Sequence, residues 1–186
     1  LQIPVGHVEA GLRTYNKYSP FPEEMNRQFV GIVSDMNFAP TERSKNNLLR
    51  EGKKEETIYV TGNTAIDALN LTVDEEYSDE ITEWIGDDRL IVLTAHRREN
   101  LGEPMKHMFR AIRRVMDEHP DVKAIYPIHM NPVVREIADS ILGDDERIRI
   151  IEPLEVLDFH NFLNRSYMIL TDSGGIQEEA PSLGKP

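Results

Sequence analysis

The sequence of 186 residues contains no cysteine, a single tryptophan and no long hydrophobic run. The absence of cysteine excludes disulfide bonds and metal sites built on thiolates, and nothing in the chain requires an oxidising compartment. The apolar runs are too short to cross a bilayer, and the N-terminal residues lack the basic-then-apolar pattern of a signal peptide. These absences predict a cytoplasmic protein that has no membrane partner.

Basic residues are also in the minority, because 21 Lys and Arg stand against 33 Asp and Glu and give a formal net charge of −12. This charge argues against a surface that binds nucleic acid by neutralising phosphates, so an anionic ligand would have to be held locally. The histidines lack the spacing of a zinc site, and no Gly-x-Gly-x-x-Gly pattern is present, so neither a metal nor a nicotinamide cofactor is predicted. Three histidines, His107, His119 and His160, are expected to be ordinary residues at the surface or its boundary.

The second half of the chain alternates short apolar runs with longer amphipathic ones. Strands are expected over 89–95, 122–128, 148–151 and 167–170, with helices over 103–118, 132–142 and 154–164 between them. Strict alternation with short connections predicts right-handed βαβ units and a parallel, doubly wound sheet. The predicted fold class is therefore α/β.

The first half of the chain shows the same alternation in shorter elements. Strands are expected over 3–8, 36–40 and 57–61, and helices over 23–34, 41–52 and 64–73. The acidic segment 74–88, with Trp84 as its one large apolar side chain, predicts a joint that carries a short helix. The prediction is the C-terminal part of a first α/β domain over 1–73, a joint over 74–88, and a nucleotide-binding second domain over 89–186 that is truncated at its end. Because both ends stop inside expected elements, the chain is expected to be a fragment of a longer protein.

A glycine-containing turn follows the last of these strands and leads into a helix. Gly174 and Gly175 allow backbone N–H groups to approach a ligand, Ser173 adds a hydroxyl donor, and the first helical turn adds unpaired amides. A phosphate or pyrophosphate is the ligand that such donors favour. Glu179 lies one turn further on the same helix face, where its carboxylate could accept hydrogen bonds from sugar hydroxyls. On spacing alone, an ordinary βα turn with a capping serine remains the alternative.

Two other turns of the second half also follow strands and carry cationic side chains. His96 and Arg97 come after the strand over 89–95, and His129 comes after the strand over 122–128. Because the carboxyl ends of parallel strands meet at one edge of the sheet, these turns are expected to lie beside the Ser-Gly-Gly turn. They would form a locally cationic pocket within an acidic protein. The alternatives are a solvated loop for the first pair and a backbone-bonded structural histidine for His129.

Two glutamates of the first half are candidates for acid–base chemistry. Glu9 follows the first expected strand, and a carboxylate in that position can act as a general acid or base in a partly dry cleft. Glu23 comes directly after Pro22 at the start of a helix. An acidic residue there is what a helix N-terminus favours, so the structural interpretation of Glu23 is the stronger one from sequence alone.

Six motifs, in one order along nearly the whole chain, resemble a single family. They are HVEAGLR at 7–13, PEEMNR at 22–27, TGNT at 61–64, HRRE at 96–99, PIHMNP at 127–132 and TDSGGIQEEAP at 171–181. Together they strongly resemble the non-hydrolysing UDP-N-acetylglucosamine 2-epimerases. Several motifs in a fixed order are far more specific than any one of them alone.

The resemblance implies two Rossmann-like domains of GT-B type, with parallel sheets and an active site in the cleft between them. It implies reversible conversion of UDP-GlcNAc to UDP-ManNAc by elimination and re-addition of UDP, without a redox cofactor or metal, to supply ManNAc for cell-surface polysaccharide. It also implies a homodimer. Family members carry further N-terminal and C-terminal segments, with a phosphate-binding Arg and a catalytic Asp, so the isolated 186 residues are expected to be inactive.

The resemblance also implies roles for individual residues. Glu9 and Glu23 would be the acid–base carboxylates, and His96 would support the departing UDP. The substrate-binding residues would be Arg27 beside the carboxylates, Phe159 by the uracil, Ser173, Gly174 and Gly175 on the pyrophosphate, and Glu179 on the ribose.

In bacterial members a second UDP-GlcNAc molecule acts as an allosteric activator. The positions that resemble its contacts are Arg97, His129 and Glu23, so that Glu23 would touch both sites. Two alternatives remain open: a GT-B glycosyltransferase that uses the same nucleotide site, and a UDP-sugar-binding module without catalysis. The pair Glu9 and Glu23 favours the epimerase over the module, because binding alone does not require two cleft carboxylates.

Overall fold

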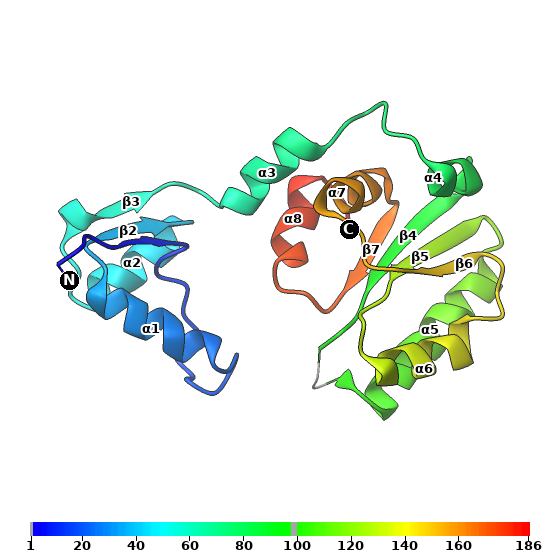
Figure 1. Cartoon of the computed structure of the whole chain (residues 1–186), viewed down its shortest axis with the longest axis horizontal. Helices are drawn as coiled ribbons and strands as arrows, with labels where there is room; N and C mark the ends of the chain where they lie inside the picture. Colours follow the sequence, from blue (N-terminus) through cyan, green and yellow to red (C-terminus); the bar gives the residue numbers. More distant parts are fainter. Residues whose placement is uncertain (1, 98–99) are drawn as a thin grey trace. The chain divides into compact units, whose positions relative to one another are not determined.

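A computed structural model describes residues 2–97 and 100–186 of the chain. Arg98 and Glu99, which end the HRRE motif, lie outside the described residues. The chain divides into two compact units, Leu1–Thr64 and Ala65–Pro186, and each contains one parallel sheet (Figure 1). The α/β class predicted from the alternating pattern is confirmed.

The sheet of the second unit has four described strands in the order β6-β5-β4-β7. The strands are β4 (Arg89–Thr94), β5 (Val122–Pro127), β6 (Ile148–Ile151) and β7 (Met168–Thr171). Its helices are α3 (Thr64–Thr72), α4 (Glu80–Ile85), α5 (Glu103–Glu118), α6 (Pro132–Leu142), α7 (Val156–Arg165) and α8 (Ile176–Ser182). The carboxyl ends of β4, β5 and β7 therefore meet at one edge, as the βαβ pattern predicted.

Helices cover both faces of this sheet (Figure 1). On one face, Phe109 of α5 packs with Ile91 and Leu93 of β4 in a core that also contains residues of α6. On the other face, Leu90 of the same strand packs with Phe162 of α7, in a core shared with α4 and α8. Because successive side chains of β4 enter opposite cores, residues 90–93 are all apolar and form one continuous hydrophobic run.

The C-terminal end of α3 is attached to α7. Thr72 Oγ1 lies 2.6 Å from His160 Nδ1, Asn161 Nδ2 donates to Thr72 O at 2.9 Å, and the backbone N–H of Asp74 donates to Asn161 Oδ1 at 2.7 Å. These bonds attach the end of α3 to the second unit, which begins at Ala65. The interpretation of His160 as a surface or boundary residue is wrong, because its side chain packs inside this contact and it is only 5% exposed.

The first unit is smaller and has the sheet order β1-β2-β3. Its elements are β1 (Gly6–Val8), α1 (Glu23–Val33), β2 (Met36–Ala39), α2 (Glu42–Arg50), a 3-10 turn (Glu55–Thr57) and β3 (Ile58–Val60). Thr41 caps α2 by accepting a hydrogen bond from the backbone N–H of Ser44 at 3.1 Å. Leu48 of α2 and Ile58 of β3 pack with Ala10 and Ala39 in the core of this unit.

A buried arginine ties the loop after β1 to the end of α2. The Arg13 side chain is 1% exposed, and its guanidinium donates to both carboxylate oxygens of Glu51, at 2.7 and 2.8 Å. It also donates to Leu12 O at 2.8 Å. A bidentate pair of this kind fixes orientation as well as distance, so the loop that carries Glu9 has a defined anchor.

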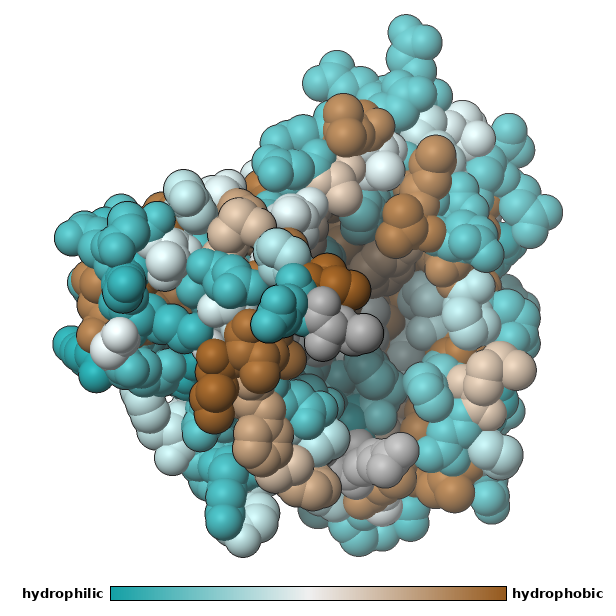
Figure 2. Space-filling model, turned by 60° about the vertical axis from the view of Figure 1, so that its left-hand side comes forward, coloured by the Kyte–Doolittle hydropathy of each residue, from teal (hydrophilic) through white to brown (hydrophobic). Residues whose placement is uncertain are grey.

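The face of the molecule in Figure 2 is largely hydrophilic, with hydrophobic side chains in scattered groups, as expected for a chain with a net charge of −12. The part of the chain that the structure describes contains no helix long and apolar enough to cross a membrane.

An ion pair between the buried Asp145 and Arg147 predicts that the stability of the protein depends on pH. Asp145 lies between α6 and β6 with a side chain only 7% exposed, and Arg147 donates to its two oxygens at 3.0 and 2.8 Å. These bonds lower the pKa of Asp145, and the charges of Arg147 and Arg113 add to the effect against the opposing effect of burial. The stabilisation is present above the unfolded-state pKa and is lost as the pH falls through the lower folded-state pKa.

We therefore expect Asp145→Asn to lower the free energy of unfolding by roughly 2 kcal/mol at pH 7, because a charged hydrogen-bond acceptor is removed from a buried site. The difference should begin to shrink as the pH falls below about 4 and should disappear only below the folded-state pKa of Asp145, which is lower. Urea unfolding of both proteins at pH 7 and at pH 3 measures it. Asp121→Asn is the matched control, because Arg89 also holds Asp121 through two bonds, at 2.8 and 2.9 Å, but at an exposed position where the loss should be smaller. A constant Asp145→Asn difference across pH would contradict the assignment.

Candidate functional site

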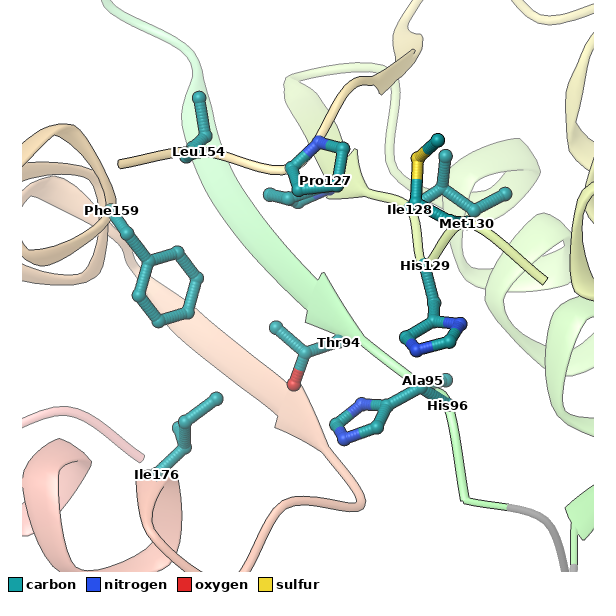
Figure 3. Close-up of a pocket in the computed structure, with 11 residues that line it drawn as sticks. Thr94, Ala95, His96, Pro127, Ile128, His129, Met130, Leu154, Phe159 and Ile176 are labelled. Atoms are coloured by element: carbon teal, nitrogen blue, oxygen red, sulfur yellow. The ribbon is translucent and has the colours of Figure 1, made fainter. Parts of the chain in front are cut away.

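A pocket of about 290 Å³ opens where the strands of the second unit end (Figure 3). Its lining residues are Thr94, Ala95, His96, Pro127, Ile128, His129, Met130, Pro153, Leu154, Phe159 and Ile176. They come from the ends of β4, β5 and β6, from α7 and from the start of α8. Ligands of open α/β sheets bind at this carboxyl edge, so the pocket is the candidate site of the unit.

The two sides of the pocket differ in chemistry. Phe159, Leu154 and Ile176 form an apolar side that suits a planar ring. Across Thr94, the imidazoles of His96 and His129 lie almost parallel, with ring centroids 5.9 Å apart and planes inclined by 10° (Figure 3). The pocket therefore offers an apolar side for a base or another flat group and imidazole nitrogens for an anion.

Strand pairing brings the His96 turn beside the Ser-Gly-Gly turn. Thr94 is the register partner of Thr171, and their hydroxyl oxygens lie 2.6 Å apart. The backbone N–H of Asp172 donates to Thr94 O at 3.1 Å, which continues the pairing past the last residue of each strand. His96 and Ser173 each follow their strand by two residues, so both lie at the same edge of the sheet, as the sequence predicted.

The Ser-Gly-Gly turn has exposed glycines and a cationic neighbour. The backbone N–H of Ser173 donates to Thr171 Oγ1 at 2.9 Å, whereas Gly174 and Gly175 are exposed just before α8. A Cβ added to Gly174 would lie 3.6 Å from Nη2 of Arg97. The guanidinium that the resemblance assigned to a second ligand therefore lies against this turn. Glu179 is half-buried one turn into α8, and its backbone N–H donates to Gly175 O at 3.1 Å.

Asp172 is a residue of this site that the sequence analysis missed. Its carboxylate accepts hydrogen bonds from the backbone N–H groups of His96 and Arg97, at 3.1 and 2.9 Å, and from Asn100 Nδ2 at 3.0 Å. Its Oδ1 lies 3.6 Å from His96 Nδ1. One feature of the sequence could have indicated a role for Asp172. It is an acidic residue directly before a turn that is expected to bind an anion, and an acidic side chain is unusual beside an anionic ligand.

The predicted acid–base residues lie in the first unit. Glu9 is exposed after β1 and has a φ of 58°, a left-handed conformation that costs a non-glycine residue about 1 kcal/mol. Glu23 is the first residue of α1 and is exposed, and Arg27 follows one turn later on the same helix face. Strained backbone of this kind occurs often at functional sites, so the conformation of Glu9 is consistent with the role that the motif suggested.

Glu24, the neighbour of Glu23, is fully buried and was also missed. Its Oε1 accepts hydrogen bonds from the backbone N–H of Tyr15 at 3.1 Å and from Gln28 Nε2 at 3.2 Å. Burial alone would raise its pKa, but hydrogen bonds and the charge of Arg13 outweigh burial and lower it. Glu24 thus attaches the loop after β1 to α1 as an ionised side chain.

Among the described residues, no group of three or more His, Asp or Glu side chains could hold a metal ion.

A family model described as UDP-N-acetylglucosamine 2-epimerase matches residues 1–186. The chain is 65% identical over 185 residues to the UDP-N-acetylglucosamine 2-epimerase of Bacillus subtilis (strain 168), and the match covers 100% of this chain and 49% of the relative. It is 56% identical over 189 residues to the putative UDP-N-acetylglucosamine 2-epimerase of Thermotoga maritima, covering 100% of this chain and 50% of that protein. The chain therefore spans about half the length of the curated relatives that it matches.

Solved structures give the same result. The S. aureus MnaA–UDP co-structure matches with a TM-score of 0.96 and 59% identity, over 100% of this chain and 51% of that one. The UDP-GlcNAc 2-epimerase from Neisseria meningitidis, solved bound to UDP-GlcNAc, matches with a TM-score of 0.88 and 46% identity, over 99% of this chain and 52% of that one.

Proposed function

The chain belongs to the family of UDP-N-acetylglucosamine 2-epimerases, and on this premise we propose that the complete protein interconverts UDP-GlcNAc and UDP-ManNAc. The family resemblance and the GT-B-type α/β fold class predicted from the sequence are confirmed. The observation that carries the proposal is the meeting of an apolar wall, two imidazoles and a glycine turn at one edge of one sheet. Such a site combines the groups that a nucleoside diphosphate requires.

In this proposal the second unit binds the UDP portion. The uracil lies by Phe159, on the apolar side of the pocket, and the ribose hydroxyls donate to the carboxylate of Glu179. The pyrophosphate accepts hydrogen bonds from Ser173 and from the backbone of Gly174 and Gly175. Because these amides are fixed by the turn, they stabilise the diphosphate charge without reorganising, including the charge that develops as UDP departs.

The chemistry is an elimination followed by a re-addition. A carboxylate of the first unit, Glu9 or Glu23, removes the proton from C2 while the C1–oxygen bond breaks and UDP leaves with the bonding electrons. UDP then re-adds at C1, and a proton is delivered to the opposite face of C2, so that no electrons are gained or lost overall. His96 supports the departing diphosphate, and Arg27 is the cationic partner of the carboxylates. Two carboxylates suit this sequence, because one proton is removed and another is returned.

Three further features extend the proposal. A second UDP-GlcNAc molecule acts as an allosteric activator through Arg97, His129 and Glu23, and the position of Arg97 beside the glycine turn supports a ligand that neighbours the substrate. The complete protein is a homodimer. Its product supplies ManNAc for cell-surface polysaccharide.

Incubation of the complete protein with UDP-GlcNAc in deuterated water tests this function. An epimerase that breaks the C2–hydrogen bond incorporates deuterium at C2 of UDP-ManNAc and, because the reaction is reversible, of the recovered UDP-GlcNAc. NMR and mass spectrometry of the recovered nucleotide sugars measure both products. A glycosyltransferase or a binding module leaves the C2 hydrogen in place, and that result, with UDP binding intact, would refute the proposal.

A further inference from the structure

We propose that Asp172 is a positioning residue for His96. Its carboxylate holds the His96 imidazole so that Nδ1 faces Asp172 and Nε2 is left for the ligand. This inference rests on the proposed function, because it says how the group that supports the departing diphosphate is held. It concerns a residue between β7 and the Ser-Gly-Gly turn that makes no direct contact with the sugar in the proposed mechanism.

The carboxylate of Asp172 is largely enclosed by donors from the His96 turn. Oδ2 accepts from the backbone N–H groups of His96 and Arg97, at 3.1 and 2.9 Å, and from the Asn100 side chain at 3.0 Å. Oδ1 lies 3.2 Å from the backbone nitrogen of His96 and 3.6 Å from its Nδ1. The Asp172 side chain is 11% exposed, whereas that of His96 is 45% exposed. One largely buried anion thus holds the backbone at His96 and Arg97 and lies close to Nδ1 of the more exposed imidazole.

A carboxylate directly before a diphosphate-binding turn would be unfavourable if its charge faced the ligand. Here both oxygens face the His96 turn, and three N–H donors and a neighbouring imidazole compensate the charge. Asp172 therefore costs the anion site little and links the two turns that the site requires. This arrangement explains why an acidic residue is compatible with its place in the TDSGG motif.

A second hydrogen bond, from Tyr126 of β5, holds the residue before His96. The hydroxyl of Tyr126, which is fully buried, donates to Ala95 O at 2.6 Å. Burial raises the pKa of this phenol, and the nearby negative charge of Asp172 raises it further, so the hydroxyl stays a donor. Tyr126 thus holds Ala95, and Asp172 holds the backbone of the next residue, His96.

The orientation has a chemical consequence for the ligand. A neutral imidazole in water carries its proton on either nitrogen, whereas an acceptor beside Nδ1 favours the form with the proton on Nδ1. With Nδ1 toward Asp172, Nε2 is the ring nitrogen that is left for the diphosphate.

The test compares the complete wild-type protein with Asp172→Asn, which keeps the side-chain shape and removes the charge. We expect the His96 ring proton of the ligand-free protein at alkaline pH to lie on Nδ1 in the wild type and to shift toward Nε2 in the variant. Long-range ¹H–¹⁵N NMR of the histidine rings, with and without UDP, reports this directly. We expect kcat to fall by about 100-fold, the loss typical of a displaced catalytic group, with KM for UDP-GlcNAc changed by less than about threefold.

Asp145→Asn is the matched control, because it also removes a buried carboxylate of the same unit but lies away from the pocket. It should leave the His96 tautomer and kcat unchanged. An Asp172→Asn protein with the wild-type tautomer and wild-type kcat would overturn the proposal, as would a loss of UDP affinity without a change of tautomer. If Asp172→Asn does not fold, the wild-type spectrum alone decides, because a free protein with the His96 proton on Nε2 contradicts the geometry. The tautomer does not depend on turnover, so a failure of the proposed function remains distinguishable from a failure of this inference.

Discussion

Replacing Glu9 by glutamine in the complete protein is expected to lower the rate of C2 hydrogen exchange by about 10³-fold, which is within the usual contribution of a general acid–base group. Glutamine has nearly the same shape as glutamate but cannot take up the C2 proton at neutral pH. The proposed UDP-binding residues, including Phe159 and Ser173, belong to the other unit of the chain, so the dissociation constant of UDP should change little. Exchange measured by NMR in deuterated water, together with calorimetric UDP binding, checks both parts.

Glu42→Gln provides the control for this prediction. Glu42 is an exposed glutamate of the same unit, in the first turn of α2, and no role is proposed for it. Its replacement should leave both exchange and UDP binding at wild-type values. Exchange that survives Glu9→Gln unchanged would remove Glu9 from the mechanism and leave Glu23 as the carboxylate to examine.

The sequence predicted the second unit well because each of its elements carries a local pattern. The expected helices over 103–118 and 132–142 coincide with α5 and α6, since both are amphipathic and each has a proline in its first turn. The three turns at the carboxyl edge followed from topology alone. Hydrophobic periodicity and the prolines and glycines that begin or end elements are properties of neighbouring residues, so one sequence is sufficient to show them.

Contacts between residues far apart in the chain could not be predicted from local patterns. The bond between Thr72 and His160 joins residues 88 positions apart and attaches the end of α3 to α7. The bonds of Asp172 to the His96 turn span 75 and 76 positions. Nothing in the local pattern of a helix or strand indicates which distant group a polar side chain will meet. The buried polar residues that organise the site were therefore the ones that the sequence analysis missed.

The loop that carries Glu9 depends on a glycine that cannot be replaced without moving backbone. Gly11 has a φ of 84°, and a Cβ added there would lie 2.2 Å from Ser44 O, 2.8 Å from Ser44 C and 3.0 Å from Leu48 Cγ. Real Cβ atoms do not approach a carbonyl oxygen this closely, so either the loop or α2 must shift. The carbonyl of Gly11 also accepts a hydrogen bond from Asn47 Nδ2 at 3.0 Å, which such a shift would break.

We therefore expect Gly11→Ala to destabilise the first unit by more than about 4 kcal/mol, because backbone overlap, left-handed strain and a lost buried hydrogen bond add together. Gly52→Ala is the matched control: Gly52 has nearly the same φ, 83°, but an added Cβ there meets nothing within 4 Å. Its cost should be only the left-handed strain, roughly 1 kcal/mol. Native-state hydrogen exchange at the backbone amides of β2 measures the stability of this unit separately from that of the other. Since Gly11 stands two residues after Glu9, the same substitution should also abolish C2 exchange, whereas Gly52→Ala should retain it; equal stability losses in the two variants would mean that the close approach of Gly11 to α2 is absent in solution.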